Sequence, residues 1–203
     1  MLFRRSLPIC VVMTSMAAHA GPMRSMVDAR TLDANCRALV EAPADARTLE
    51  PAIAADLSAA SCLAEARMRA LTLGPSQASV DALNEAIRPS LALLEAVAST
   101  GDPRAEILAA HAKGALYSGV AVRFMAVAPS LPRPVTEGGQ AEHHKVVAEL
   151  DRLARPWRDR AAAAFADVER LGAAAPARVQ DDPVVAVAVA DRPAERVPGV
   201  ARK

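Results

Sequence analysis

The chain has 203 residues, a mass of 21.2 kDa and a net charge of +1, which is enough for one domain. Alanine supplies 48 residues and only five residues are aromatic, a composition that excludes β-sandwiches and barrels and favours helices. The balanced charge excludes a basic nucleic-acid binder. We predict an all-α protein: an antiparallel bundle of four to five long helices with a disordered C-terminal tail.

The first twenty residues have the pattern of a secretory signal. Arg4 and Arg5 precede a mostly apolar stretch over 6–18, and a small-x-small motif then predicts cleavage between Ala20 and Gly21. The apolar stretch is too short to span a hydrocarbon core of about 30 Å. The sequence therefore predicts an exported protein, either periplasmic or secreted.

Cleavage would leave a nearly neutral protein. It removes two arginines and no acid, so 22 basic and 23 acidic residues remain, a net charge of −1. Such a chain has no charge-based affinity for nucleic acid or for anionic lipid. The most apolar later stretch, 105–129, carries four charged or titratable side chains, so we expect no integral membrane span after cleavage.

Two cysteines remain after cleavage, Cys36 and Cys62, separated by 26 positions. In an oxidising compartment two thiols are more often paired than free, so we predict a disulfide between them. The alternative is two independent buried thiols that pack as small apolar residues. A redox role is disfavoured because the chain contains no C-x-x-C motif.

Two helices are predicted in the first third of the mature chain. The spacing of Leu32, Cys36 and Leu39 predicts a short helix over 31–41. A second helix is expected over 48–72, with Thr48 as its N-cap. Its apolar stripe consists of Leu49, Ile53, Leu57, Ala60, Ala64, Met68 and Leu71.

A third helix is predicted over 76–99, with Ser76 as the N-cap and Gly101 as the stop signal. Pro89 lies inside this pattern and is expected to kink the helix near Glu85. The apolar stripe is the clearest of the chain and consists of Val80, Leu83, Ile87, Leu91, Leu94 and Ala98.

A fourth helix should begin at Asp102 and Pro103, an acidic N-cap followed by proline at the first helical position, and run over 103–127. One edge of this helix carries almost only small residues: Ala105, Leu108, Ala112, Ala115, Gly119, Val122 and Ala126. Such an edge allows the close approach of a neighbouring backbone.

The region 129–139 holds three prolines and two glycines and is predicted to be a surface loop. A fifth helix follows over 140–171, and Pro156 should kink or break it at Arg155. Its apolar positions include Val147, Leu150, Ala154, Trp157, Ala161, Ala164, Phe165, Val168 and Leu171.

The proline-rich remainder predicts a flexible tail, so the chain divides into a signal (1–20), a helical domain (21–172) and a tail (173–203). One tail segment, 184–190, is rich in valine and suits an extended strand. We consider that it adds a strand to a partner's sheet, or that it is disordered and has no partner. The side chains that would contact a partner are Val184, Val185, Val187 and Val189.

Motifs for common chemistries are absent from the sequence, so we expect no cofactor and no metal. No glutamate precedes a histidine by three residues, and C-x-x-C-H, H-E-x-x-H, G-x-S-x-G and glycine-rich phosphate loops are missing. His143 and His144 are adjacent, so they point about 100° apart on a helix and are expected to be solvated. His111 is expected to be partly buried and hydrogen-bonded.

The interpretation that we favour is a non-enzymatic interaction or scaffold protein of the cell envelope, whose partner is another envelope protein. This hypothesis predicts an exposed apolar groove or tail. A carrier of a small apolar ligand would instead enclose a cavity of several hundred Å³. An enzyme with a site assembled around His111 would place that histidine in a cleft beside an acid.

Overall fold

The computed structural model describes residues 36, 51–131 and 134–191, and these residues form helices and connecting turns without a strand. The predicted all-α antiparallel bundle is confirmed. The elements in chain order are α2 (Pro51–Arg69), α3 (Gln77–Ala98), α4 (Pro103–Ser130), α5 (Glu137–Ala174), α6 (Ala177–Gln180) and α7 (Pro183–Ala190).

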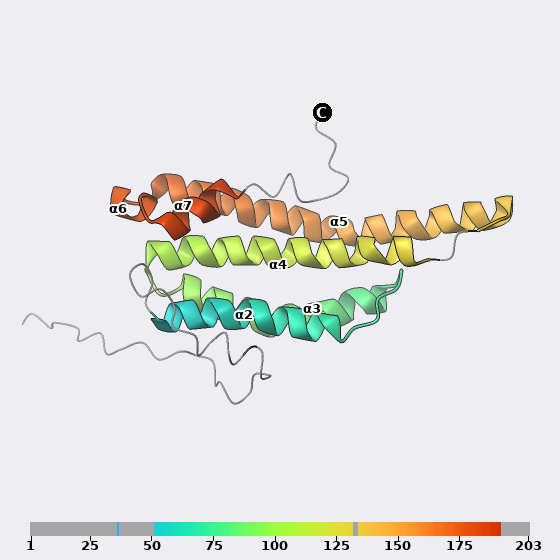
Figure 1. Ribbon diagram of the computed structural model, residues 1–203, viewed down its shortest axis with the longest axis horizontal. Helices are drawn as coiled ribbons and strands as arrows, with labels where there is room; N and C mark the ends of the chain where they lie inside the picture. The colour runs from blue at the N-terminus through green and yellow to red at the C-terminus, as the bar shows by residue number, and fades with distance from the viewer. Residues whose placement is uncertain (1–35, 37–50, 132–133, 192–203) are drawn as a thin grey trace, which may run out of the picture.

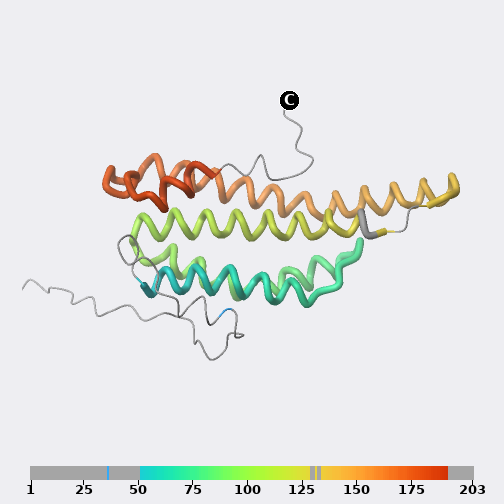
Figure 2. Tube along the Cα trace, in the orientation of Figure 1, coloured from blue at the N-terminus to red at the C-terminus, as the bar shows by residue number. Residues whose placement is uncertain are grey.

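The bundle consists of two hairpins, α2 with α3 and α4 with α5, and short connections make the neighbours in each hairpin antiparallel (Figure 1). Helix α4 is the central element because it contacts α2, α3, α5 and α7. The first turns of α5 extend beyond the other helices, while α6 and α7 fold back over its C-terminal end (Figure 2).

The predicted helix boundaries are confirmed where the sequence carries capping residues. The Oγ of Ser76 accepts a hydrogen bond from the Ser79 amide, and Oδ1 of Asp102 accepts one from the Arg104 amide at 2.9 Å. Gly101 separates α3 from α4 with φ of +79°, a conformation that favours glycine.

Helix α5 and the loop before it both differ from expectation. A kink or a break was predicted at Pro156. Helix α5 is continuous through this residue, so a break is excluded. Proline removes one backbone hydrogen bond, but Leu153, Ala154 and Trp157 around it are all buried, and their packing offsets that loss. The predicted loop is also shorter than expected, because α4 continues to Ser130 and α5 already begins at Glu137.

The main core lies where all four long helices meet. Trp157 is 1 % exposed, and the Tyr117 ring lies 6.1 Å from it between centroids. The Arg160 guanidinium covers the indole at 4.8 Å, a cation–π contact. The largest fully buried neighbours in this cluster are Phe124, Leu83, Ile87, Leu150 and Val120.

The C-terminal region requires a correction, because helix continues well past the predicted end of the domain at position 172. The segment expected as a strand or as disorder is helix α7. Asp182 caps α7 by accepting hydrogen bonds from the amides of Val184 and Val185, and Val185 is buried in one cluster with Ile107. Capping and burial outweigh the preference of valine for extended strands.

The chain before α2 is described only at Cys36, which is helical and bonded to Cys62 of α2 as predicted. Cys36 is buried in a cluster with Ala59, Cys62 and Leu93, so it lies on the side of α2 that faces α3. The predicted helix over 31–41 and the signal with its Ala20–Gly21 cleavage site otherwise lie outside the described residues.

Reduction of the Cys36–Cys62 disulfide should lower the free energy of unfolding. In the chain-entropy model, opening a loop closed across 26 residues costs about 3.5 kcal/mol, less any native strain. Thermal unfolding with and without a reductant measures this difference, and the Cys36→Ser/Cys62→Ser variant should match the reduced protein. Peptide mapping that finds both thiols free in the oxidised protein would contradict the pairing.

Candidate functional site

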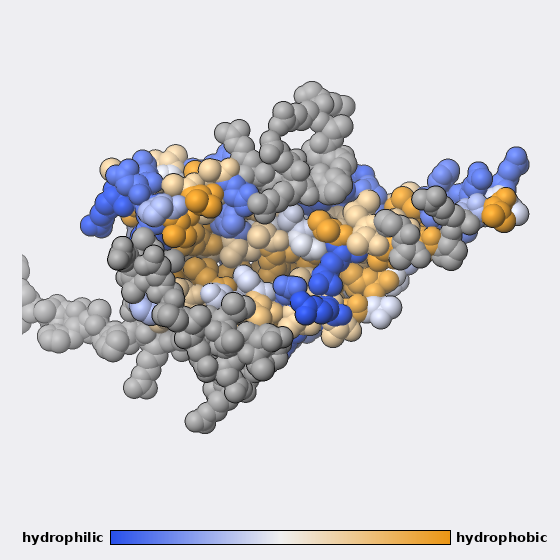
Figure 3. All heavy atoms as spheres, viewed as in Figure 1, coloured by the Kyte–Doolittle hydropathy of each residue, from blue (hydrophilic) through white to orange (hydrophobic). Residues whose placement is uncertain are grey.

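A long apolar groove runs between α2 and α4, and we define it by the residues that line two adjoining cavities. The cavities have volumes of about 310 and 540 Å³ and share Ser61, Glu65 and Ala112. Apolar surface lies between the two helices on this side of the molecule (Figure 3). The lining is Ala54, Leu57, Ser58, Ser61, Cys62, Ala64, Glu65, Met68, Leu108, Ala112, Ala115, Leu116, Gly119, Arg123 and Val184.

The floor of the groove is the small-residue edge of α4. Ala115 is exposed, and a Cβ added to Gly119 would meet no atom within 4 Å. Among the described residues, no neighbouring backbone makes use of the close approach that this edge allows around Ala115 and Gly119. Ala105, at the start of the same edge, is fully buried against Ile53.

The polar groups in the α2 wall are already hydrogen-bonded within their own helix. The Ser58 hydroxyl donates to the Ala54 carbonyl at 2.9 Å, and the Ser61 hydroxyl donates to the Leu57 carbonyl at 3.3 Å. Backbone amides and carbonyls in the helix interiors are likewise paired. The groove thus presents apolar surface with little unsatisfied polarity along its length.

Charge in the groove is confined to two side chains near one end. Arg123 of α4 donates from Nη1 to the Met68 carbonyl at 3.3 Å. Glu65 of α2 has an exposed carboxylate that accepts from Arg69 at 2.6 Å. At the other end Val184, which is 43 % exposed, brings α7 to the rim beside Leu108.

Helix α4 makes its close approach on another face, towards α5. A Cβ added to Gly114 would lie 2.8 Å from ring carbons of Phe165, so only glycine fits there without displacing the ring. The missing side chain at this position thus allows α4 and α5 to pack closely. The groove between α2 and α4 has no corresponding contact.

His111 lies next to the groove but does not line either cavity. Its Nε2 is 2.9 Å from Oδ2 of Asp191, the residue that ends α7, and its ring meets Phe165 edge-on at 5.6 Å. The expectation of a partly buried, hydrogen-bonded histidine is confirmed. This pair connects α4 to the end of α7, eighty residues further along the chain.

The other candidate metal ligands stay apart from His111. His143 and His144 lie in the first turns of α5, with ring centroids 6.4 Å apart, at the end of the molecule away from α7. Within the described ranges, no group of three or more His, Cys, Asp or Glu residues is placed to hold a metal ion.

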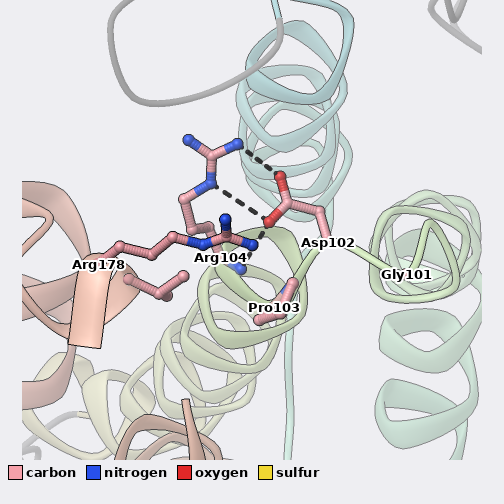
Figure 4. A pocket seen from close by; sticks show the side chains of 6 residues that line it. Gly101, Asp102, Pro103, Arg104 and Arg178 are labelled. Carbon is pink, nitrogen blue, oxygen red and sulfur yellow. Dashed lines mark hydrogen bonds and ion pairs between the residues drawn. The ribbon is translucent and has the colours of Figure 1, made fainter. Parts of the chain in front are cut away.

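A polar cavity of about 500 Å³ lies at the start of α4, where Arg178 reaches from α6 towards Asp102 and Arg104 (Figure 4). Asp102 accepts hydrogen bonds from Nε and Nη2 of Arg104 at 3.2 and 2.8 Å. These hydrogen bonds hold the pKa of the Asp102 carboxyl below its ordinary value, against the opposing effect of burial. The acid and the base neutralise each other, which indicates a structural role.

The sequence showed the small edge of α4 but not that the edge is uncovered. Helical periodicity identifies which residues share a face, whereas the groove depends on how far α2 lies from α4. The separation of these two helices arises from tertiary packing, and no local sequence signal reports it.

Comparisons with protein-family models, with curated proteins and with solved structures gave no match. Across the described part of the chain, none of the helices has the length and hydropathy needed to cross a membrane.

Substitution of two glycines in α4 by alanine should have opposite effects on stability. Gly119→Ala should stabilise the protein by up to about 1 kcal/mol, because alanine favours helix and its Cβ meets open space. Gly114→Ala should destabilise it by about 1–3 kcal/mol, because the Cβ overlaps the Phe165 ring. Chemical denaturation of both variants measures the change in the free energy of unfolding. If Gly119→Ala destabilised the protein as much as Gly114→Ala, the groove floor would be covered.

The ion pair of Asp102 with Arg104 should make stability depend on pH. Because the pKa of Asp102 is lowered in the folded protein, its contribution to stability is present above the ordinary pKa of 3.8 and is lost as the pH falls through the folded pKa. Asp102→Asn retains an N-cap but loses the charge, at a cost of up to about 1 kcal/mol at pH 7.

This cost should shrink as the pH is lowered from 7 to below 3.8, when denaturation of Asp102→Asn is compared with that of the wild type. Asp167→Asn, which removes the exposed pair with Arg170, serves as the control and should change little. A cost for Asp102→Asn that is the same at both pH values would contradict this account.

Proposed function

We propose that the protein is an exported, non-enzymatic interaction module of the cell envelope that binds a partner protein in the α2–α4 groove. The observation that carries this proposal is the groove itself, which is apolar, open and elongated. Its α2 wall spans Ala54 to Met68, about 21 Å at 1.5 Å per residue. Grooves between helices are a common docking surface for segments of other proteins.

The shape of the groove favours a macromolecular partner over a small ligand. A carrier buries most of its ligand in an enclosed cavity with a few convergent polar groups. Here both cavities lie side by side along the surface, and the serine hydroxyls in the wall are already engaged with carbonyls of their own helix.

The contacts of His111 favour a structural role over catalysis. Its Nε2 is engaged by Asp191 and its ring packs on Phe165, so both contacts attach α7 and α5 to α4. The neighbouring acid is what the enzyme hypothesis expects, but a general base must also reach a substrate in a cleft with its other ring nitrogen. The groove residues include neither this histidine nor a histidine from α5.

Export is supported by the signal pattern of residues 1–20 and by the Cys36–Cys62 disulfide, which would persist in an oxidising compartment. We expect the mature protein to begin at Gly21. N-terminal sequencing of protein from the envelope fraction or the medium measures this, and a start at Met1 in that material would contradict cleavage.

Filling the groove should abolish partner binding. Ala115→Trp places an indole on the exposed floor, whereas Ala163→Trp places the same side chain on an exposed position of α5. The mature wild type and both variants, immobilised at equal density, are incubated with an envelope extract of the source cells. Quantitative mass spectrometry should find a protein retained by the wild type and by Ala163→Trp, and depleted at least tenfold with Ala115→Trp.

Equal retention by all three proteins, or retention of nothing by the wild type, would contradict the proposal. Native mass spectrometry of the purified protein provides a second readout. A small apolar molecule that remains bound to the wild type and is lost from Ala115→Trp would support a carrier in place of an interaction module.

A further inference from the structure

We propose that the partner segment is an amphipathic helix of about four turns that runs antiparallel to α2 and α4 and carries an acidic residue four positions before a basic one. This inference rests on the proposed function, since it specifies what occupies the same groove. Four features of the groove support it: its backbone, its length, its direction and its charges.

The backbone of the groove excludes an extended occupant. A strand binds through main-chain hydrogen bonds to unpaired amides and carbonyls at a sheet edge. The walls are interior turns of α2 and α4, whose backbone groups are paired within each helix, and the Ser58 and Ser61 hydroxyls bond to carbonyls. A helix satisfies its own backbone and needs only apolar contact, which this groove provides.

The length and floor of the groove match a helix of about four turns. Its walls extend from Ala54 to Met68 and from Leu108 to Arg123, each about 21–23 Å, which corresponds to about 15 helical residues. Over Ala115 and Gly119 the floor is low, and the space above Gly119 is empty. A docked helix can therefore approach closely there, packing its side chains over the small residues.

The direction follows from the helix dipoles. Helices α2 and α4 are parallel, because each is antiparallel to α3, and their C-terminal ends meet where Arg123 reaches the Met68 carbonyl. Parallel neighbours place like partial charges side by side. A third helix that runs antiparallel to both places its positive N-terminus beside their negative C-terminal ends. The N-terminus of the partner helix should therefore lie at the Arg123 end of the groove.

The charges then fix the order of residues in the partner. Glu65 precedes Met68 by three residues, so Glu65 and Arg123 lie about one helical turn apart along the groove. An antiparallel helix meets Arg123 first and Glu65 one turn later. It therefore presents an acid to Arg123 and a base to Glu65, whose exposed ion pair with Arg69 is weak enough to be exchanged. The resulting Glu-x-x-x-Lys order also stabilises the partner helix itself.

We assign the occupant to another molecule, because neither of the described parts of the chain that lie nearest to the groove fills it. Cys36, the described residue of the chain before α2, is buried against Ala59 and Leu93, on the α3 side of α2. Helix α7 reaches only the end of the groove, where Val184 lies near Leu108, and it is tied there by the His111–Asp191 contact.

Two synthetic peptides of 15 residues test the proposal. Both have an alanine–leucine apolar face and a fluorescent label, and they differ only in carrying Glu-x-x-x-Lys or Lys-x-x-x-Glu beside that face. Fluorescence polarisation with the full mature protein should show about two- to fivefold tighter binding of the Glu-x-x-x-Lys peptide. The Glu65→Lys/Arg123→Glu variant should invert this preference.

A matched control reverses the exposed pair on α5 with Glu149→Lys/Arg152→Glu and should leave the preference unchanged. Binding of neither peptide, or a preference that the groove variant does not invert, would overturn the helix proposal. Depletion of the envelope protein by Ala115→Trp is a separate result, so failure of the peptides and failure of the groove as a binding site are distinguishable.

A second copy of this chain could also occupy the groove, and sedimentation equilibrium tests this by measuring the molar mass. We expect the wild type and Ala115→Trp to have the same molar mass. Self-association of the wild type that Ala115→Trp removes would overturn the assignment of the groove to a different protein.

Discussion

The close packing of α4 against α5 is the constraint on which the rest of the structure depends. With no side chain at Gly114, the Phe165 ring lies directly against the helix, and the same ring meets His111 one turn earlier. His111 in turn holds Asp191 at the end of α7. One face of α4 thereby positions α5 and α7, and the small-residue edge, about 100° around the helix, faces α2.

The small-residue edge explains why an apolar groove exists in a well-packed bundle. Small residues normally permit close helix packing, yet α2 covers only the beginning of the edge, where Ala105 is buried with Ile53. Further along, Ala115 is exposed and Gly119 faces empty space. If α2 and α4 packed closely along their whole length, the protein would gain stability by closing this gap. A groove that stays open is therefore consistent with our proposal that a partner binds there.

Local signals predicted the parts of this fold that local chemistry determines. Ser76 and Asp102 cap their helices and Gly101 ends one as expected, because capping depends on a few neighbouring atoms. A break at Pro156 and a strand or disorder at the valines of α7 were predicted wrongly, since burial of Trp157 and Val185 outweighs local propensity. The groove was not predicted because it depends on the distance between helices far apart in sequence.

The central claim is that a partner helix lies on the groove floor, and photo-crosslinking in the source cells tests it most directly. A benzophenone side chain at Ala115, with one at exposed Ala163 as the control, reports what lies within a few ångströms of each position. The account predicts one adduct specific to Ala115, which maps to a helical segment with an acid four residues before a base. Adducts that are absent at Ala115, or the same at both positions, would contradict it.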